Sequence, residues 1–143
     1  MRTIKAIYLH CSDSDRPEHD SVEVIREWHT KRGFTGPDGV SGTKDDIGYH
    51  FFITRNGELN KGRDENKIGA HVKNHNKFTL GVCFSGRTFK DFHSEQFIAG
   101  RKLVLELIEK YKLTKKDVKL HRDSDSGKTC PNFSLKDFWQ EDP

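Results

Sequence analysis

The sequence predicts an α/β domain of three layers, in which a central mixed β-sheet is flanked by helices. Segments with strand-like and helix-like patterns alternate along the chain, which is typical of a sheet covered by helices. An Asn56-Gly57 turn between two β-prone runs predicts an antiparallel hairpin in the middle. No repeat, low-complexity tract or linker interrupts the chain, so we expect one domain over residues 1–143.

The N-terminal part is expected to supply a buried strand and a helix. Residues 3–10 predict an interior strand that ends at His10, because its tail AIYLH is almost continuously apolar. Residues 20–33 predict a helix with Asp20 as its N-cap, since Glu23 follows three residues later in a capping-box pattern. The inner face of this helix is expected to comprise Val22, Ile25, Trp28 and His29.

The middle of the chain is expected to supply a loop, the hairpin and a second buried strand. Residues 34–46 are rich in Gly, Pro and Asp and predict an exposed loop. Residues 48–63 contain the hairpin, with its turn at Asn56-Gly57. Residues 78–86, FTLGVCFSG, predict the next buried strand because they are short and nearly all apolar.

The C-terminal part is expected to close the domain with two helices and a strand. Residues 93–112 show the clearest helical pattern, with Ser94 as the predicted cap. Residues 117–121 predict a last strand that ends at His121. Residues 134–139 predict a short helix after the polar loop that follows.

Composition and charge restrict the classes of partner. Apolar residues make up 32% and charged residues 33% of the chain, which predicts a modest core under a polar surface. The net charge of +3 is too small to argue for nucleic acid but suits weak attraction to an anionic polymer. We find no signal-peptide core and no run that could span a bilayer. We therefore expect synthesis in the cytoplasm, no membrane insertion and a monomer.

Two histidines and a cysteine suggest a metal site. His10 and His121 each close a predicted strand, and the carboxyl ends of parallel neighbours meet at one edge of a sheet. Cys130 follows in a polar loop that could fold back there, and two imidazoles with one thiolate form a zinc set that leaves a position for water. The spacing alone also fits chance histidines and a cysteine packed as a small apolar residue.

Two further residues could serve such a site. Lys128 lies two residues before Cys130, so in an extended segment both side chains share a face and the ammonium could stabilise an oxyanion. Tyr49 opens the hairpin and could offer its phenol. An ordinary surface lysine and a half-buried strand tyrosine remain the alternatives.

These residues stand within segments that together resemble a known family. The segments are, in chain order, IYLHCS, IREWH, RGF, DIGYHFFI, NGELNKGRDE, GAHV, TLGVCFSG and LHRDSDSGKTCPNF. The chain resembles the zinc-dependent type 2 N-acetylmuramoyl-L-alanine amidases, which include lysozyme-type phage endolysins and animal peptidoglycan recognition proteins. The resemblance implies the fold of those proteins and a single Zn²⁺ per chain. It is strongest to the short phage enzymes, which are single amidase domains.

The resemblance implies a role for each matching residue. The zinc ligands are matched by His10, His121 and Cys130, and the active-site tyrosine and lysine by Tyr49 and Lys128. Two positions match a substrate groove less specifically, namely His71 of GAHV and Arg63 of GRDE. For Arg63 a surface salt bridge fits equally well.

The remaining candidates are given structural roles, and one segment departs from the family. His50 should face away from Tyr49, and Cys11 and Cys83 are expected in the core. The odd cysteine count and the lack of a CxxC motif argue against a disulfide scaffold. Residues 35–45 form an insertion where the shorter enzymes have a residue or two, and we expect it to rim the groove.

The implied function is zinc-dependent hydrolysis of the amide bond between N-acetylmuramic acid and L-alanine in peptidoglycan. The phage-type enzyme would be an endolysin that reaches the cell wall through a separate membrane pore. A non-catalytic peptidoglycan-binding module is an alternative, although binding-only members commonly lack the cysteine that Cys130 supplies. A cytoplasmic wall-recycling amidase is another, although those relatives usually carry aspartate there. Binding to a polymerase ranks lowest, because the short N-terminus leaves little room for a regulatory arm.

Overall fold

The computed structural model describes residues 2–36 and 42–140, and its centre is a mixed β-sheet. The strands, in the sheet order β3-β2-β4-β1-β5, are β3 (Leu59–Lys61), β2 (Phe51–Ile53), β4 (Thr79–Phe84), β1 (Ala6–Cys11) and β5 (Val118–Leu120). β1 runs parallel to β4 and β5, and β2 runs parallel to β4 but antiparallel to β3. The predicted hairpin is the β2-β3 pair, and the mixed sheet is confirmed.

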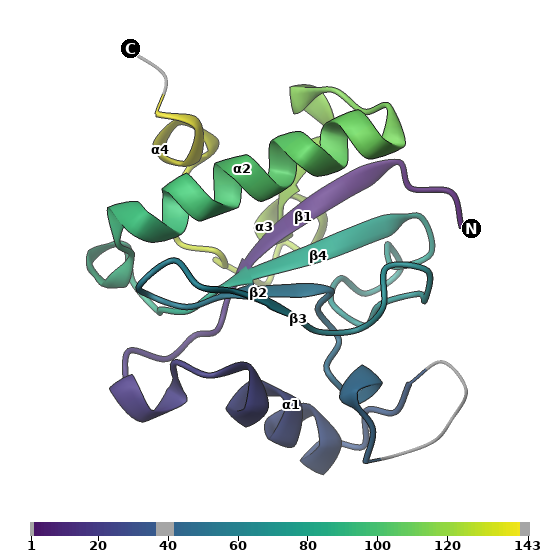
Figure 1. Cartoon of the computed structure of the whole chain (residues 1–143), viewed down its shortest axis with the longest axis vertical. Helices are drawn as coiled ribbons and strands as arrows, with labels where there is room; N and C mark the ends of the chain where they lie inside the picture. The colour runs from purple at the N-terminus through teal and green to yellow at the C-terminus, as the bar shows by residue number, and fades with distance from the viewer. Residues whose placement is uncertain (1, 37–41, 141–143) are drawn as a thin grey trace.

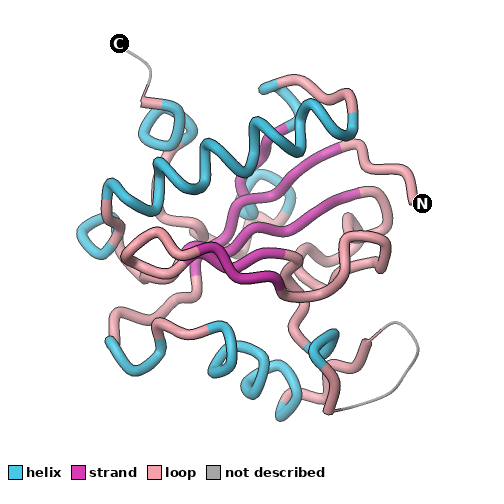
Figure 2. Tube along the Cα trace, in the orientation of Figure 1, coloured by secondary structure: helices cyan, strands magenta, loops and turns pink. Residues whose placement is uncertain are grey.

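Helices cover both faces of the sheet. α1 (Val22–Lys31) lies on one face, and α2 (Ser94–Tyr111) lies on the other together with α4 (Leu135–Trp139) (Figure 1). α3 (His121–Ser124) follows β5 directly, and short 3₁₀ helices occur at η1 (Pro17–His19), η2 (Lys44–Asp46), η3 (Phe89–Asp91) and η4 (Lys115–Asp117). Figure 2 shows the strands as a layer between the two sets of helices, which confirms the three-layer fold class. Within the described residues, no helix is long and apolar enough to cross a membrane.

The core has one part on each side of the sheet. The larger part lies under α2 and α4, where the Phe84 ring of β4 contacts the rings of Phe97, Phe133 and Phe138. The smaller part lies under α1 and contains Ile25 and Phe52. Every residue of β1 and β4 is buried. Burial on both faces of the sheet explains why the sequences of these strands are almost continuously apolar.

Two helix caps differ from the prediction by one residue. α1 is capped by Ser21, because the carboxylate of the predicted cap Asp20 accepts a hydrogen bond from the Arg55 N–H at 3.1 Å. α2 has His93 at its N-cap position in place of Ser94. At α1 the distant Arg55 N–H binds the predicted cap, whereas at α2 the His93 N–H donates to the Gln96 side chain in a local capping box.

The predicted exposed loop over residues 34–46 is buried at its C-terminal end. Asp45 and Asp46 belong to η2 and are 6% and 0% exposed. The Asp46 carboxylate accepts hydrogen bonds from the Thr30 hydroxyl at 2.6 Å and from the Gly42 N–H at 2.7 Å. These bonds fix the end of the loop to α1, and residues 37–41 lie outside the described part of the chain.

Candidate active site

The carboxyl ends of β1 and β5 bring His10 and His121 together. The two strands are parallel, with Leu9 opposite Leu120, and each histidine is the next residue along its own segment. Their Nδ1 atoms lie 3.2 Å apart and their ring centroids 4.6 Å apart. His121 was predicted as the last strand residue but is the first residue of α3. Its imidazole nevertheless lies beside that of His10.

Cys130 reaches these histidines because its loop folds back over the edge of the sheet. The Arg122 N–H donates to the Cys130 carbonyl at 3.0 Å, which closes the loop that begins with α3. The Cys11 N–H donates to the Cys130 Sγ at 2.9 Å. One ligand atom each of His10, His121 and Cys130 lie within 4.8 Å of one another. In a search of the described residues for clusters of histidine, cysteine and acidic side chains, these three residues form the group that could hold a metal ion.

The spacing of the two histidine nitrogens fits a tetrahedral zinc ion. Nitrogen ligands at about 2.0 Å from zinc lie roughly 3.3 Å apart when they subtend the tetrahedral angle. The observed distance between the Nδ1 atoms of His10 and His121 is 3.2 Å. Two imidazoles and one thiol leave the fourth position for water, as in catalytic rather than structural zinc sites.

The electrostatics of the pocket favour neutral histidines. Burial, followed by the nearby His121 imidazole, holds the pKa of His10 well below its ordinary value. Burial also lowers the pKa of His121, although the Asp125 carboxylate opposes the shift. Both imidazoles are therefore in the metal-binding form at neutral pH. The Cys11 thiol and burial raise the pKa of the Cys130 thiol, so a cation is needed to favour its thiolate.

His71 lies beside His10 and also lines a cleft. Its Nδ1 is 3.0 Å from His10 Nε2, and its Nε2 is 3.3 Å from the Thr79 hydroxyl oxygen. The ring lines the cleft, but it is only 8% exposed and both of its nitrogens are engaged within the fold. The predicted substrate contact through His71 therefore has no free ring nitrogen to use.

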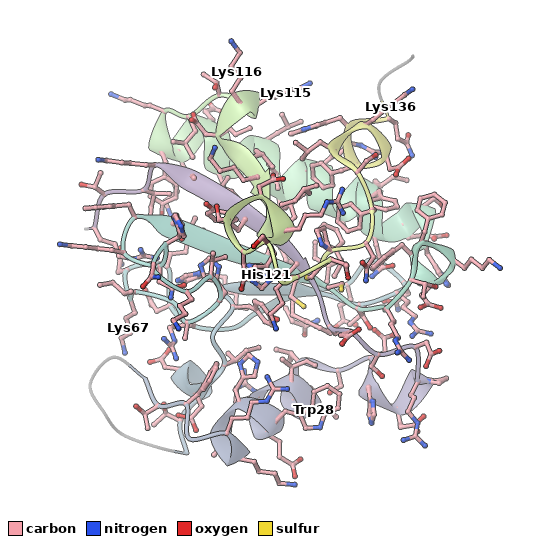
Figure 3. The ribbon with its side chains drawn as sticks, turned by 180° about the vertical axis from the view of Figure 1, so that it is seen from behind. Trp28, Lys67, Lys115, Lys116, His121 and Lys136 are labelled. Carbon is pink, nitrogen blue, oxygen red and sulfur yellow. The ribbon has the colours of Figure 1, made fainter. Side chains whose placement is uncertain are left out.

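A cleft of about 540 Å³ is lined by His121 and Cys130, while His10 is fully buried next to His121 and does not line it. One wall includes Tyr49, His71, His121 and Lys128, and the other is supplied by α1. Figure 3 shows His121 and the α1 residue Trp28 on the side of the molecule seen there. The cleft is therefore a groove between the sheet edge and α1, bordered by His121 and Cys130.

Tyr49 and Lys128 both line this cleft. The Tyr49 ring centroid is 5.0 Å from that of His10, and burial raises the pKa of its phenol well above the ordinary value. The phenol therefore stays protonated and can donate a hydrogen bond. Lys128 is exposed, and its backbone N–H donates to the Asp125 carbonyl at 3.0 Å in the turn before Cys130.

Arg63 lies away from the cleft, in neither of the two predicted roles. It is 4% exposed and is absent from the residues that line the cleft. Its guanidinium donates to three backbone carbonyls at 2.8 to 2.9 Å, those of Thr35, Asp45 and Ile68. The arginine therefore holds together the ends of the 35–45 insertion. Among the described residues of that insertion none lines the cleft, so the expected rim is not seen there.

Three cleft residues, two on α1 and one at its C-cap, were predicted only as part of a helix. Trp28, His29 and Arg32 line the cleft. His29 also fixes α1 to the sheet, because its Nδ1 accepts a hydrogen bond from the Gly48 N–H at 2.8 Å, and burial lowers its pKa to about 4. Helical periodicity cannot distinguish a face that packs on a core from one that borders a groove. The shared IREWH segment was the available signal.

Comparison with known proteins agrees with this geometry. A family model described as N-acetylmuramoyl-L-alanine amidase matches residues 1–133. The endolysin of Enterobacteria phage T3 is 33% identical over 145 residues, covering 97% of this chain and 87% of that protein. The endolysin of Klebsiella phage KP32 is 34% identical over 141 residues, covering 94% and 85%.

Solved structures give the same result. The N-acetylmuramoyl-L-alanine amidase LysC from Clostridium intestinale superposes with a TM-score of 0.78 at 28% identity, covering 97% of this chain and 85% of that one. Drosophila peptidoglycan recognition protein SD, with a TM-score of 0.76 at 19% identity and coverage of 100% and 83%, shares the fold. Because the family model extends from the first strand to the residues after Cys130, the chain belongs to the N-acetylmuramoyl-L-alanine amidase family.

Proposed function

We propose that the chain hydrolyses the amide bond between N-acetylmuramic acid and L-alanine of peptidoglycan, using one zinc ion held by His10, His121 and Cys130. The observation that carries the proposal is the pair of Nδ1 atoms 3.2 Å apart, with the Cys130 thiol beside them at the base of a cleft. A binding-only module would have no need for this donor set. The names of the phage relatives as endolysins support a lytic role on the cell wall.

The protein groups around the donors suit a zinc ion. The two histidines would offer Nδ1 and Cys130 its Sγ, and the N–H of Cys11 at 2.9 Å would stabilise the thiolate. When bound, zinc supplies Lewis-acid activation of water and of the amide carbonyl near neutral pH. Burial keeps both histidines neutral and ready to bind.

Tyr49 and Lys128 act on the reacting groups from the cleft wall. The protonated phenol of Tyr49 donates a hydrogen bond to the attacking water or to the tetrahedral carbon's oxygen. The ammonium of Lys128 faces the carbonyl oxygen, where negative charge develops, and lowers the energy of that charge. Trp28 and Arg32 on the opposite wall contact the muropeptide and hold the scissile amide over the base of the cleft.

Digestion of purified sacculi tests the proposal. Sacculi treated with the protein are expected to gain amino-terminal alanine, which dinitrophenylation followed by hydrolysis measures. Removing the metal with a chelator should reduce the release of alanine ends to background, because the water and the carbonyl are then no longer activated. Adding Zn²⁺ should restore the release.

Two outcomes would contradict the proposal. New reducing sugar ends without alanine ends would show a glycosidase, and alanine release that persists after the metal has been removed would exclude the zinc mechanism. Soluble anhydro-muropeptides used in place of sacculi would separate wall recycling from lysis, since a lytic enzyme should prefer the intact polymer.

A further inference from the structure

A chain of hydrogen bonds runs from Thr79, the first residue of β4, to the proposed metal-ligand group, which comprises His10, His121 and Cys130. The Thr79 hydroxyl lies 2.7 Å from the His75 carbonyl and 3.3 Å from His71 Nε2. His71 Nδ1 lies 3.0 Å from His10 Nε2. His10 then presents its other nitrogen, Nδ1, to His121 at 3.2 Å. Thr79, His71 and His10 are all buried, which limits the competition of water for these contacts.

The direction of each bond follows from the one proton of the Thr79 hydroxyl. A carbonyl can only accept a hydrogen bond, so the Thr79 hydroxyl donates to the His75 carbonyl at 2.7 Å. Its oxygen is then the acceptor for His71 Nε2–H at 3.3 Å. If the hydroxyl instead donated to His71 Nε2 at 3.3 Å, the shorter contact with the His75 carbonyl at 2.7 Å would have no proton.

The remaining protons follow along the chain. A neutral imidazole with its proton on Nε2 has a lone pair on Nδ1, so His71 Nδ1 accepts from His10 Nε2–H. His10 consequently carries its proton on Nε2 and its lone pair on Nδ1. That nitrogen is the one that lies beside His121 in the metal-ligand group.

The fold also fixes the ring of His71 in the required orientation. The Asn76 side-chain oxygen accepts hydrogen bonds from the backbone N–H groups of His71 and Val72, both at 2.9 Å. Gly81 of β4 leaves room for the ring, since a Cβ there would lie 2.7 Å from His71 Cγ. The imidazole thus lies flat against the strand with its two nitrogens aimed at Thr79 and His10.

We propose that Thr79 is a positioning residue of the metal site: its hydroxyl, through His71, sets the tautomer of His10 and so directs the Nδ1 lone pair to the metal. The inference rests on the proposed zinc site. Partners of this kind that hold a ligating histidine are typically worth about 10- to 100-fold in metal affinity. No atom of Thr79 needs to touch metal or substrate for this effect.

The test compares Thr79→Val, which removes the hydroxyl at nearly constant volume, with Thr79→Ser, which keeps it. Zinc affinity of the purified full chain, measured by competition with a chromogenic chelator, is expected to fall about 10- to 100-fold in the valine variant and to stay near wild type in the serine variant. Thr30→Val serves as the matched control, because its hydroxyl bonds to the Asp46 carboxylate at 2.6 Å, in a different part of the fold. That variant should bind zinc like wild type.

Nitrogen-15 NMR of the histidine rings in the metal-free protein provides a second readout that a merely structural role would not move. The wild type and the serine variant should show the Nε2–H tautomer at His71 and His10, and the valine variant a mixture at His71. Unchanged zinc affinity in Thr79→Val, or Nδ1–H on His10 in the wild type, would overturn the inference. A wild type that binds no zinc would instead contradict the proposed function, and the NMR result would still decide the tautomers.

Discussion

Replacing Cys130 by serine is expected to remove zinc from the protein and to lower amidase activity by about 1000-fold or more. A serine hydroxyl is a far weaker zinc ligand than a thiolate, and only His10 and His121 would remain. The change is isosteric, so the fold should persist. Metal content per chain, determined by plasma emission spectrometry, and release of alanine ends from sacculi measure the two effects together.

Cys83→Ala provides the control for this variant. Cys83 is fully buried in the core under α1 and lies outside the group that could hold a metal. Its loss should cost some stability, about 1 kcal/mol, because a small buried group is deleted. Zinc content should stay at one ion per chain. A Cys130→Ser protein that keeps its zinc and its full activity would show that the thiol is not a ligand.

Replacing Lys128 by alanine is expected to lower kcat by about 10²- to 10³-fold while zinc binding is retained. The ammonium stabilises negative charge that exists only in the transition state, so KM should change little. Steady-state kinetics on a soluble muropeptide, with zinc content measured on the same sample, separate this effect from the loss of metal in Cys130→Ser.

Lys116→Ala is the matched control, because both lysines are exposed but Lys116 lies far from His121 in Figure 3. Its kcat should equal that of the wild type. A Lys128→Ala enzyme with unchanged kcat would remove the lysine from the mechanism, and a drop that accompanies loss of zinc would assign it to the metal site instead.

The sequence was sufficient to predict the strands of the sheet and the two histidines at its edge. Long apolar runs such as AIYLH predict interior strands because both faces of β1 are covered. His10 was predicted as the strand end and lies one residue before it, since β1 ends at Cys11. His121 was placed in the same way, although its segment turns into α3 one residue early. A one-residue error is harmless there, because the side chain leaves the strand end in either case.

Residues whose role depends on distant partners were harder to predict. Arg63 stands in a charged segment, and only the fold shows that its guanidinium is buried against backbone carbonyls of the 35–45 insertion. His71 matched a groove position, yet its nitrogens are engaged by Thr79 and His10. Trp28 and Arg32 looked like ordinary positions of an amphipathic helix. Contacts between residues far apart in sequence leave no periodic signal.

Anomalous diffraction at the zinc absorption edge, from crystals of the chain grown with Zn²⁺, tests the central claim most directly. The claim predicts one strong anomalous peak per chain, at bonding distance from His10 Nδ1, His121 Nδ1 and Cys130 Sγ, with a fourth position facing the cleft. A protein that releases alanine ends from sacculi in the same buffer, but shows no peak between these three side chains, would contradict it.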